Sequence, residues 1–460
     1  MNALLTPASD AAVPVHVVSA ETWPALQGRL SPAHRNFASA QGFAARSGQH
    51  CVLPDSQGAL AAVVLGVETG ARRRDPFAPG RLSSLLPAGD YALEGEIDDV
   101  ALAALGWLLQ GYRFERYRKP NPPRARLSLP DGVDGEEISL IAESAMLARD
   151  LVNTPANELG PGEIEAAIRG LSAECGASVT SIVGDDLLAR NFPMIHAVGR
   201  ASPRAPRLVD LVWGDPAHPK VTLVGKGVAF DTGGLNLKPD ASMLLMKKDM
   251  GGAAAAIAAA RMIMLAKLPV RLRLVVPTVE NAVSGNAFRP GDVLSSRKGL
   301  SVEIGNTDAE GRLILADALA LADEETPELL VDFATLTGAA RTALGPELPP
   351  FYTHDDGLAA EIARIGMAVN DPAWRLPLWR PYDGLLDSKI ADVNHVSSGG
   401  MAGSVTAALF LNRFVEKTQS YAHFDIYAWN PSSKPGRPEG GECQGARLIH
   451  ALVKQLYPRG

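Results

Sequence analysis

From about residue 160 to the end of the chain, short runs rich in β-branched residues alternate with longer helical runs. We predict strands at residues 221–224, 270–276 and 329–336, and helices at residues 251–265, 313–323 and 405–415. This alternation is typical of a mostly parallel sheet covered by helices, because parallel strands need a crossover connection. The sequence therefore predicts an α/β fold for this region.

The beginning of the chain is expected to form a smaller α/β domain. Its predicted elements are strands at residues 13–18 and 59–67 and a helix at residues 98–109. Residues 119–132 are rich in proline and charge, which favours extended backbone and predicts a linker. We therefore predict an N-terminal domain of unassigned role at residues 1–130. A catalytic domain is predicted at residues 131–460, including a connecting helix at residues 136–153.

Composition argues against several classes of protein. Hydrophobic residues make up 46% of the 460 residues and charged residues 21%, which favours a folded chain over a disordered one. The formal net charge of -7 argues against nucleic acid as the main partner. The most apolar run, residues 253–260, is too short to span a membrane. No signal-peptide pattern is present and Cys51, Cys175 and Cys443 lie far apart, so the expected location is the cytoplasm.

Glycines and polar residues concentrate in two parts of the sequence that follow predicted strands. The first part reads VGKGVAFDTGGLNLKP (residues 224–239) and KDMGG (residues 248–252), and the second reads GNTDAEGRL (residues 305–313). In open α/β sheets, ligands bind where loops leave the carboxyl ends of strands. Lys226 stands directly after a predicted strand, between two glycines that allow a sharp bend. We therefore expect the functional site in these segments.

These segments contain four acids, Asp231, Asp249, Asp308 and Glu310. The spacing of two places Asp308 and Glu310 on the same side of extended backbone. Four carboxylates at one edge of a sheet would repel one another, and burying them unpaired is very unfavourable. Two divalent cations, roughly 3.5–4 Å apart in known two-metal hydrolytic sites, would cancel this charge. The structural alternative is that the acids are helix caps and surface charges, with Asp249 as the N-cap of the following helix.

Motifs for other chemistries are missing from the sequence. It contains no HExxH zinc motif, no GxxxxGK[ST] phosphate loop, no GxGxxG fingerprint and no GxSxG nucleophile elbow. The nine histidines all lie outside the two polar segments, and we interpret His395 and His423 as structural residues. Metal-assisted hydrolysis is the chemistry that the residues favour.

At these residues the sequence resembles the leucine aminopeptidase (cytosol aminopeptidase) family. The resemblance covers most of residues 110–460, and the octapeptide NTDAEGRL (residues 306–313) is the family's own signature. Its other blocks are GYRFERY (111–117), NTPAN (153–157), residues 224–239, DMGG (249–252), ATLTG (334–338) and GSVTAALF (403–410). The N-terminal region matches the family poorly. The resemblance implies an aminopeptidase with a mostly parallel catalytic sheet and two divalent metal ions per subunit, zinc or manganese.

The resemblance also implies which residues hold the ions. Asp231, Asp308 and Glu310 match the ligands of one ion. Lys226, Asp249, Asp231 and Glu310 match those of the other, so Asp231 and Glu310 would bridge the two. A water that bridges the ions is expected to be the nucleophile.

Two further residues match the family's catalytic machinery. Lys238 matches a lysine that stabilises the developing oxyanion. Arg312 matches an arginine that holds bicarbonate as the general base, assisted by the amides of Gly311 and Leu336. These assignments come from the resemblance alone.

The substrates implied are peptides with a free N-terminus, and the assembly implied is a homohexamer. Met246, Thr335 and Gly338 match positions that line the pocket for the first side chain. Tyr427 stands where better-known members have a small residue, so it either narrows this pocket or points into the core. The alternative functions are a nucleic-acid-binding regulator and a non-catalytic structural homologue on the same fold.

Overall fold

The protein is described here by a computed structural model covering residues 2–70, 74–119 and 124–459, so residues 120–123 of the predicted linker lie outside the described residues. The chain forms two compact units, residues 1–146 with 432–439 and residues 147–431 with 440–460. The division falls inside helix α4 (Gly135–Asn153), and the predicted domain boundary at 130/131 stays a prediction. Within the described ranges, no helix has both the length and the apolar character needed to cross a membrane.

The first unit contains a six-stranded sheet in the order β1-β6-β5-β2-β4-β3. Only the β3–β4 pair is antiparallel among the strand pairs that the structure describes in this sheet. The strands are β1 (Leu5–Thr6), β2 (Val13–Val18), β3 (His50–Pro54), β4 (Leu60–Gly66), β5 (Gly89–Gly95) and β6 (Ala125–Ser128). The helices are α1 (Trp23–Arg29), α2 (Pro32–Ala40), η2 (Ala78–Ser84) and α3 (Val100–Gln110). The strands predicted at 13–18 and 59–67 and the helix predicted at 98–109 correspond to β2, β4 and α3.

The second unit is built on a nine-stranded sheet in the order β16-β15-β18-β14-β9-β11-β8-β7, with β10 also paired to β11. The strands β18, β14, β9 and β11 are parallel and form its centre, whereas β8, β7 and β15 pair in the antiparallel sense. The central strands are β9 (Lys220–Gly225), β10 (Gly227–Asp231), β11 (Arg271–Asn281), β14 (Leu329–Ala334) and β18 (Tyr421–Asp425). The outer strands are β7 (Ser178–Val183), β8 (Arg207–Trp213), β15 (Pro350–Tyr352) and β16 (Trp374–Arg375).

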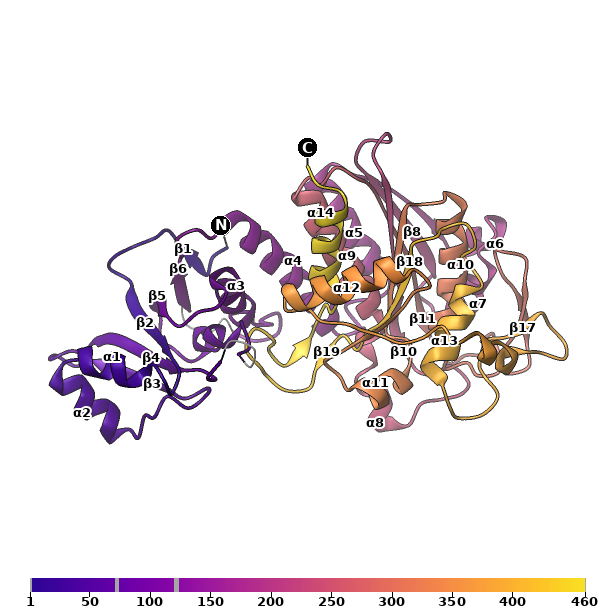
Figure 1. The fold of residues 1–460 in the computed structure, drawn as a ribbon. Coiled ribbons are helices and arrows are strands. Elements are labelled where there is room, and N and C mark those ends of the chain that lie inside the picture. The colour runs from indigo at the N-terminus through magenta and orange to yellow at the C-terminus, as the bar shows by residue number, and fades with distance from the viewer. Residues whose placement is uncertain (1, 71–73, 120–123, 460) are drawn as a thin grey trace. The chain divides into compact units, whose positions relative to one another are not determined.

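The central strands are buried along almost their whole length, so their sequences are continuous apolar runs and do not alternate. Helices α5 (Pro161–Cys175), α9 (Gly251–Leu265) and α14 (Ala446–Leu456) cover one face of the sheet (Figure 1). The other face packs against α7 (Pro193–Gly199), α10 (Gly311–Glu324) and α13 (Gly403–Asn412). The predicted α/β class with a mostly parallel sheet is therefore confirmed.

The remaining elements of the second unit are short helices and two small sheets. The helices are α6 (Asp186–Ala189), α8 (Asp240–Met243), η3 (Met246–Met250), α11 (Gly338–Leu344), α12 (Asp356–Ala368) and η4 (Arg380–Leu386). One small sheet contains β12 (Val293–Ser295), β13 (Ser301–Glu303) and β17 (Val393–Asn394), and the other contains β19 (Trp429–Asn430) and β20 (Gly440–Gly441).

Strand β11 continues five residues beyond the predicted end at residue 276. Pro277 lies inside it, and proline normally interrupts a central strand because it has no N–H to donate. Here β11 changes partner at this point: its pairing with β9 ends at Val275 and its pairing with β10 begins at Thr278. The proline is tolerated in this interval, and the strand reaches Asn281.

The carboxyl ends of the parallel strands meet at one edge of the sheet. β9 ends at Gly225, β10 at Asp231, β14 at Ala334 and β18 at Asp425. The two predicted polar segments begin at these strand ends or pack beside them. This edge is where the candidate site lies.

Candidate metal centre

Lys226 occupies the break between β9 and β10. Its N–H donates to the carbonyl of Phe333 in β14 at 3.0 Å, and its carbonyl accepts from the N–H of Ala253 in α9 at 2.8 Å. Lys226 is 3% exposed to solvent. Its side chain runs past Gly311, the first residue of α10. The strand break therefore fixes Lys226 with its ammonium group inside the edge of the sheet.

The ammonium group of Lys226 joins two acids from different segments. Nζ lies 2.7 Å from Oδ2 of Asp249 and 3.0 Å from Oε1 of Glu310, and it donates to the carbonyl of Thr335 at 2.8 Å. Asp249 belongs to η3, and the N-cap of the following helix α9 is Met250. Asp249 is therefore not the helix cap of the structural alternative. Its Oδ1 accepts instead from the hydroxyl of Thr335 at 2.8 Å.

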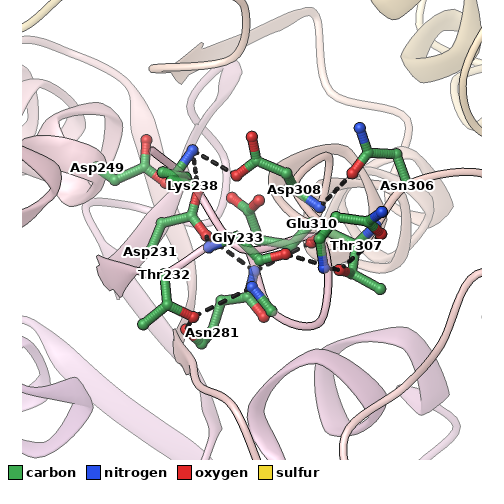
Figure 2. Close-up of polar contacts among 12 residues, drawn as sticks. Asp231, Thr232, Gly233, Lys238, Asp249, Asn281, Asn306, Thr307, Asp308 and Glu310 are labelled. Atoms are coloured by element: carbon green, nitrogen blue, oxygen red, sulfur yellow. Dashed lines mark hydrogen bonds and ion pairs between the residues drawn. The ribbon is translucent and has the colours of Figure 1, made fainter. Parts of the chain in front are cut away.

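The loop after β10 turns back and brings Lys238 onto Asp231. Gly233 and Gly234 have φ of 88° and 63°, in the left-handed region that glycine adopts without strain. The loop closes through a hydrogen bond from the N–H of Lys238 to the carbonyl of Thr232 at 2.9 Å. Nζ of Lys238 then lies 2.9 Å from Oδ2 of Asp231 and 2.5 Å from Oδ1 of Asp308 (Figure 2).

The loop before α10 presents Asp308 and Glu310 and is held on two sides. On one side, Thr307 donates its hydroxyl to the carbonyl of Gly233 at 2.6 Å. On the other side, Nε2 of His395 donates to the carbonyl of Asn306 at 2.8 Å, while Nδ1 accepts from the N–H of Gly305 at 3.2 Å. His395 thus has the structural role that we inferred for it.

The pKa values of the two lysines, and those of Asp308 and Glu310, are all raised. Burial alone would lower the pKa of Lys226, but the charges of Asp249, Glu310 and Asp231 outweigh it and raise this pKa. The pKa of Lys238 is raised in the same way, chiefly by Asp231. Burial and then the charge of Asp231 raise the pKa of Asp308 to about 6, and the same two causes raise that of Glu310. Both lysines are cations in this protein without metal.

The acids of the site fit divalent cations. Oxygens of Asp231, Asp308 and Glu310 all lie within 4.8 Å of one another, a spacing that suits shared coordination. One buried oxygen each of Asp249, Asp308 and Glu310 accepts no hydrogen bond of good geometry, and contacts only lysine nitrogens as ion pairs. The two lysines offset only half of the charge of the four acids. The remaining negative charge and these under-satisfied oxygens are what metal cations would stabilise.

Arg312 lies buried beside the acids, in the first turn of α10. Its Nη1 donates to the carbonyl of His395 at 2.7 Å, and its Nε has no partner among the described residues. Burial lowers the pKa of Arg312 to about 10, which leaves it charged near neutral pH. Such a guanidinium group is suited to hold an anion.

The amide of Leu336, predicted to assist that anion, already has a partner. It donates to Oδ1 of Asp425 at 3.0 Å, and the amide of Thr337 donates to the same oxygen at 3.1 Å. Asp425 also accepts from the hydroxyls of Thr337 and Ser404. These bonds turn the chain away from β14, which therefore ends at Ala334 and not at residue 336 as predicted.

The predicted pocket residues lie on four segments around Asp249. Met246 begins η3, Thr335 follows β14, Gly338 begins α11 and Tyr427 follows β18. Thr335 contacts Asp249 directly through its hydroxyl. Tyr427 is half-buried and lies beyond the end of its strand, so strand alternation does not decide which way its ring points.

Two polar residues of the site were not predicted from the sequence. Nδ2 of Asn281 donates to Oδ1 of Asp231 at 2.8 Å and to the carbonyl of Thr307 at 3.0 Å, joining the two polar loops (Figure 2). Asp425 fixes the segment after β14. Both are the last residues of parallel strands, and that position is the signal that would have identified them.

Comparison with known proteins gives matches along most of the chain. The family model described as the cytosol aminopeptidase family, catalytic domain, matches residues 146–450. A second model, the M17 aminopeptidase N-terminal domain, matches residues 13–130. The probable cytosol aminopeptidase of Syntrophotalea carbinolica is 41% identical over 368 residues, which cover 76% of this chain and 74% of that protein.

Two solved structures share the fold. The cytosol aminopeptidase of Coxiella burnetii is 45% identical, with a TM-score of 0.93 over 99% of both chains. The bottromycin maturation enzyme BotP in complex with Mn is 33% identical, with a TM-score of 0.87 over 97% of this chain and 100% of that chain. Both therefore align with both units of this protein.

Proposed function

The chain belongs to the cytosol aminopeptidase family of peptidases, and from this premise we propose that it hydrolyses the N-terminal peptide bond of peptides with the help of two divalent metal ions. The observation that carries the proposal is the cluster of four acids and two lysines at the carboxyl edge of the second sheet. Its buried, under-satisfied oxygens suit metal cations, and its lysines suit a reaction in which negative charge develops.

The metal ligands proposed are those that the cluster brings together. Asp231, Asp308 and Glu310 would hold one ion, and Lys226 and Asp249, together with Asp231 and Glu310, would hold the other. When bound, the ions act as Lewis acids and lower the pKa of water toward neutrality. Zinc and manganese are the metals proposed, and the solved complex of BotP with Mn supports the second. Lys226 would bind through its neutral amine, so it must give up a proton.

Lys238 has a distinct role in the proposed reaction. In the protein without metal, the charge of Asp231 raises the pKa of Lys238 and keeps it protonated. An ammonium group can donate a hydrogen bond to the substrate carbonyl oxygen as that oxygen becomes negative, which stabilises the transition state more than the ground state. Its present partners, Asp231 and Asp308, are two of the proposed metal ligands, so Lys238 lies beside the proposed metal centre.

Arg312 is proposed to bind bicarbonate, with the amides of Gly311 and Leu336. The free Nε of Arg312 supports an anion in its vicinity. The bond from the Leu336 amide to Asp425 means that this amide would have to share its hydrogen between two acceptors. The bicarbonate would take up a proton from the attacking water as the general base.

Selectivity for N-terminal residues follows from the same ligands, because a free substrate amine can bind a metal ion and an internal peptide bond has no such amine.

The location proposed is the cytoplasm, in line with the names of the relatives. A homohexamer is also proposed. Four side chains of the second unit support an oligomer because each exposes more than half of its surface: Met367, Trp374, Trp379 and Ile390. Light scattering of the 48.5 kDa chain would measure the assembly.

The experiment that tests the function is a panel of aminoacyl amides and short peptides, assayed with zinc, manganese, cobalt and magnesium after removal of bound metal. Metal-dependent release of the first residue, and no cleavage of N-acetylated copies of the same peptides, supports an aminopeptidase. Bound metal without turnover would favour the non-catalytic homologue. Salt-dependent binding of duplex DNA without peptidase activity would favour the nucleic-acid-binding regulator.

A further inference from the structure

The ring of Tyr427 lies close to two basic side chains from different segments. Nζ of Lys248 is 4.7 Å from the centre of the ring, and Cζ of Arg341 is 4.8 Å from it. The backbone beneath the ring is fixed, because the amides of Tyr427 and Ala428 both donate to Oε1 of Gln444 at 3.0 Å. Ala428 has a positive φ of 57°. It packs closely on Gly251, the first residue of α9: a β-carbon placed on Gly251 would lie 2.1 Å from the β-carbon of Ala428. The ring and these two basic side chains therefore form one group on a fixed backbone, the Tyr427 stack.

The Tyr427 stack borders the candidate metal centre. Lys248 immediately precedes Asp249, whose side chain is bonded to the hydroxyl of Thr335. Gly338 begins α11 three residues after Thr335, and a β-carbon on Gly338 would lie 3.6 Å from Nη2 of Arg341. Gly338 is exposed and Arg341 is partly exposed, so both are open to a ligand. A peptide bound at the acids would therefore place its first side chain within reach of the Arg341 guanidinium.

Neither basic side chain of the stack forms an ion pair among the described residues. Arg341 donates from Nη1 to the carbonyl of Thr337 at 2.7 Å, and its Nε and Nη2 donate no other hydrogen bond within the described ranges. Other poorly exposed arginines of the same unit do have acidic partners: Arg149 pairs with Glu442, and Arg273 pairs with Asp210. Asp249, which neighbours Lys248 in the sequence, is already engaged by Lys226. Among the described residues, the guanidinium group of Arg341 is therefore not paired with a carboxylate.

We propose that the Tyr427 stack selects peptides whose N-terminal residue is glutamate or aspartate, with Arg341 as the specificity-determining residue. This inference rests on the proposed aminopeptidase function. A guanidinium group binds a carboxylate through two parallel hydrogen bonds, and Arg341 has the donors Nε and Nη2 for this geometry. An N-terminal lysine or arginine would meet the like charge of Arg341, which disfavours it.

The test compares substrates that differ only in charge. Glutamyl and glutaminyl 4-nitroanilides have nearly the same shape, and leucyl and lysyl 4-nitroanilides complete the set, all with the manganese-loaded protein. We expect kcat/KM for glutamyl to exceed that for glutaminyl at least about tenfold, with lysyl the poorest substrate. Arg341→Met keeps an apolar stem over the ring and should bring the glutamyl-to-glutaminyl ratio close to one while leucyl turnover is retained. Arg341→Glu should raise lysyl turnover relative to glutaminyl.

Each other outcome identifies what fails. If no substrate is cleaved with any metal, the aminopeptidase function itself is wrong. If glutaminyl and glutamyl are cleaved equally well by the wild type, the function stands and the inference is overturned. A uniform loss on all four substrates in Arg341→Met would assign Arg341 a structural role in α11 and also overturn it. Arg364→Met is the matched control, because Arg364 is an exposed arginine on α12 and should leave every ratio unchanged.

Discussion

A β-carbon placed on Gly311 would lie 2.5 Å from Cε of Lys226 and 2.7 Å from its Nζ. The first residue of α10 therefore has to be a glycine if the lysine is to pass it and reach Asp249 and Glu310. This contact links the two polar segments of the sequence, since Lys226 and Gly311 are 85 positions apart. It also gives Gly311 a steric role in addition to its proposed bicarbonate-binding amide.

We predict that Gly311→Ala displaces Lys226 and weakens metal binding together with turnover. Alanine keeps the backbone N–H of residue 311, so any loss comes from the added methyl group and not from a missing donor. A displacement that disturbs one ligand costs roughly 10–100-fold in metal affinity by analogy with loss of a supporting contact at other metal sites. Metal content and peptide hydrolysis of the folded variant measure the effect, and Gly285→Ala, where open space surrounds the glycine, is the control. Unchanged affinity would contradict the steric role.

The variants Asp308→Ala and Glu310→Ala test the metal ligands directly. Each is expected to abolish turnover and to lower the amount of bound metal, because both acids are needed to neutralise the ions and Glu310 is proposed to bridge them. Asp308→Asn and Glu310→Gln separate charge from shape, since they keep the side-chain volume. Asp240→Asn, an exposed acid on nearby α8, should behave as the wild type. Near-wild-type activity in any of the four variants of Asp308 and Glu310 would contradict the two-metal assignment.

The sequence was informative where function depends on short segments that follow a strand. The alanine-rich run predicted a helix at 251–265, and these are the bounds of α9. Thirteen residues of this helix are buried and most of them are apolar, which is why the whole helix is visible in the sequence as an apolar run. Lys226, Asp231, Asp308 and Glu310 were identified as candidates because they stand at strand ends or in the family signature. Their convergence in the structure follows from the parallel order of β9, β10, β11 and β14.

The residues that the sequence did not identify depend on contacts between distant segments. Asn281 was missed because the strand was predicted to end at residue 276, whereas it continues through Pro277 after a change of partner. Asp425 accepts hydrogen bonds from amides 88 and 89 positions away, and no local motif records that arrangement. The placement of Tyr427 between Lys248 and Arg341 likewise joins three segments that only the tertiary structure brings together.

Lys238→Ala is expected to lose mainly kcat and to keep both ions. Lys238 pairs with Asp231 and Asp308 in this structure, but its proposed interaction with the substrate strengthens only as charge develops on the carbonyl oxygen. The loss should be roughly 10²–10³-fold, as for removal of one oxyanion donor elsewhere. Steady-state kinetics with metal analysis of the same sample checks this. A change confined to KM, or a loss of metal, would assign Lys238 another role.

Acid should destabilise the protein through His395. Its pKa is lowered to about 3, chiefly by burial and then by the charge of Arg312, whereas an unfolded histidine titrates near 6.5. Between these values the unfolded chain binds one more proton than the folded chain. Stability from this residue is therefore complete above pH 6.5 and is lost as the pH falls below it.

Urea unfolding of the metal-free protein at pH 7.5 and 5.5 measures this loss. The wild type should lose about 1.4 kcal/mol more than His395→Gln over this interval, because the variant has no ring to titrate. His218→Gln, which changes an exposed histidine, should follow the wild type. Equal losses in the wild type and His395→Gln would mean that the buried ring takes up a proton as readily as a free one.

Tyr427→Ala should change the preference of the enzyme between bulky and small neutral N-terminal residues. The ring contacts Lys248 and Arg341 and would lose both contacts if it turned away. We therefore expect its removal to open space in the predicted pocket, which also includes Gly338 and Thr335. One methylene is worth roughly 1–3 kcal/mol in such pockets, so removal of a whole ring should shift the kcat/KM ratio of leucyl to alanyl substrates at least tenfold. Neutral substrates make this result independent of the charge of Arg341. Tyr382→Ala, an exposed tyrosine of η4, is the control. If Tyr427→Ala keeps the wild-type ratio, the ring lies outside the pocket and only supports the loop after β18.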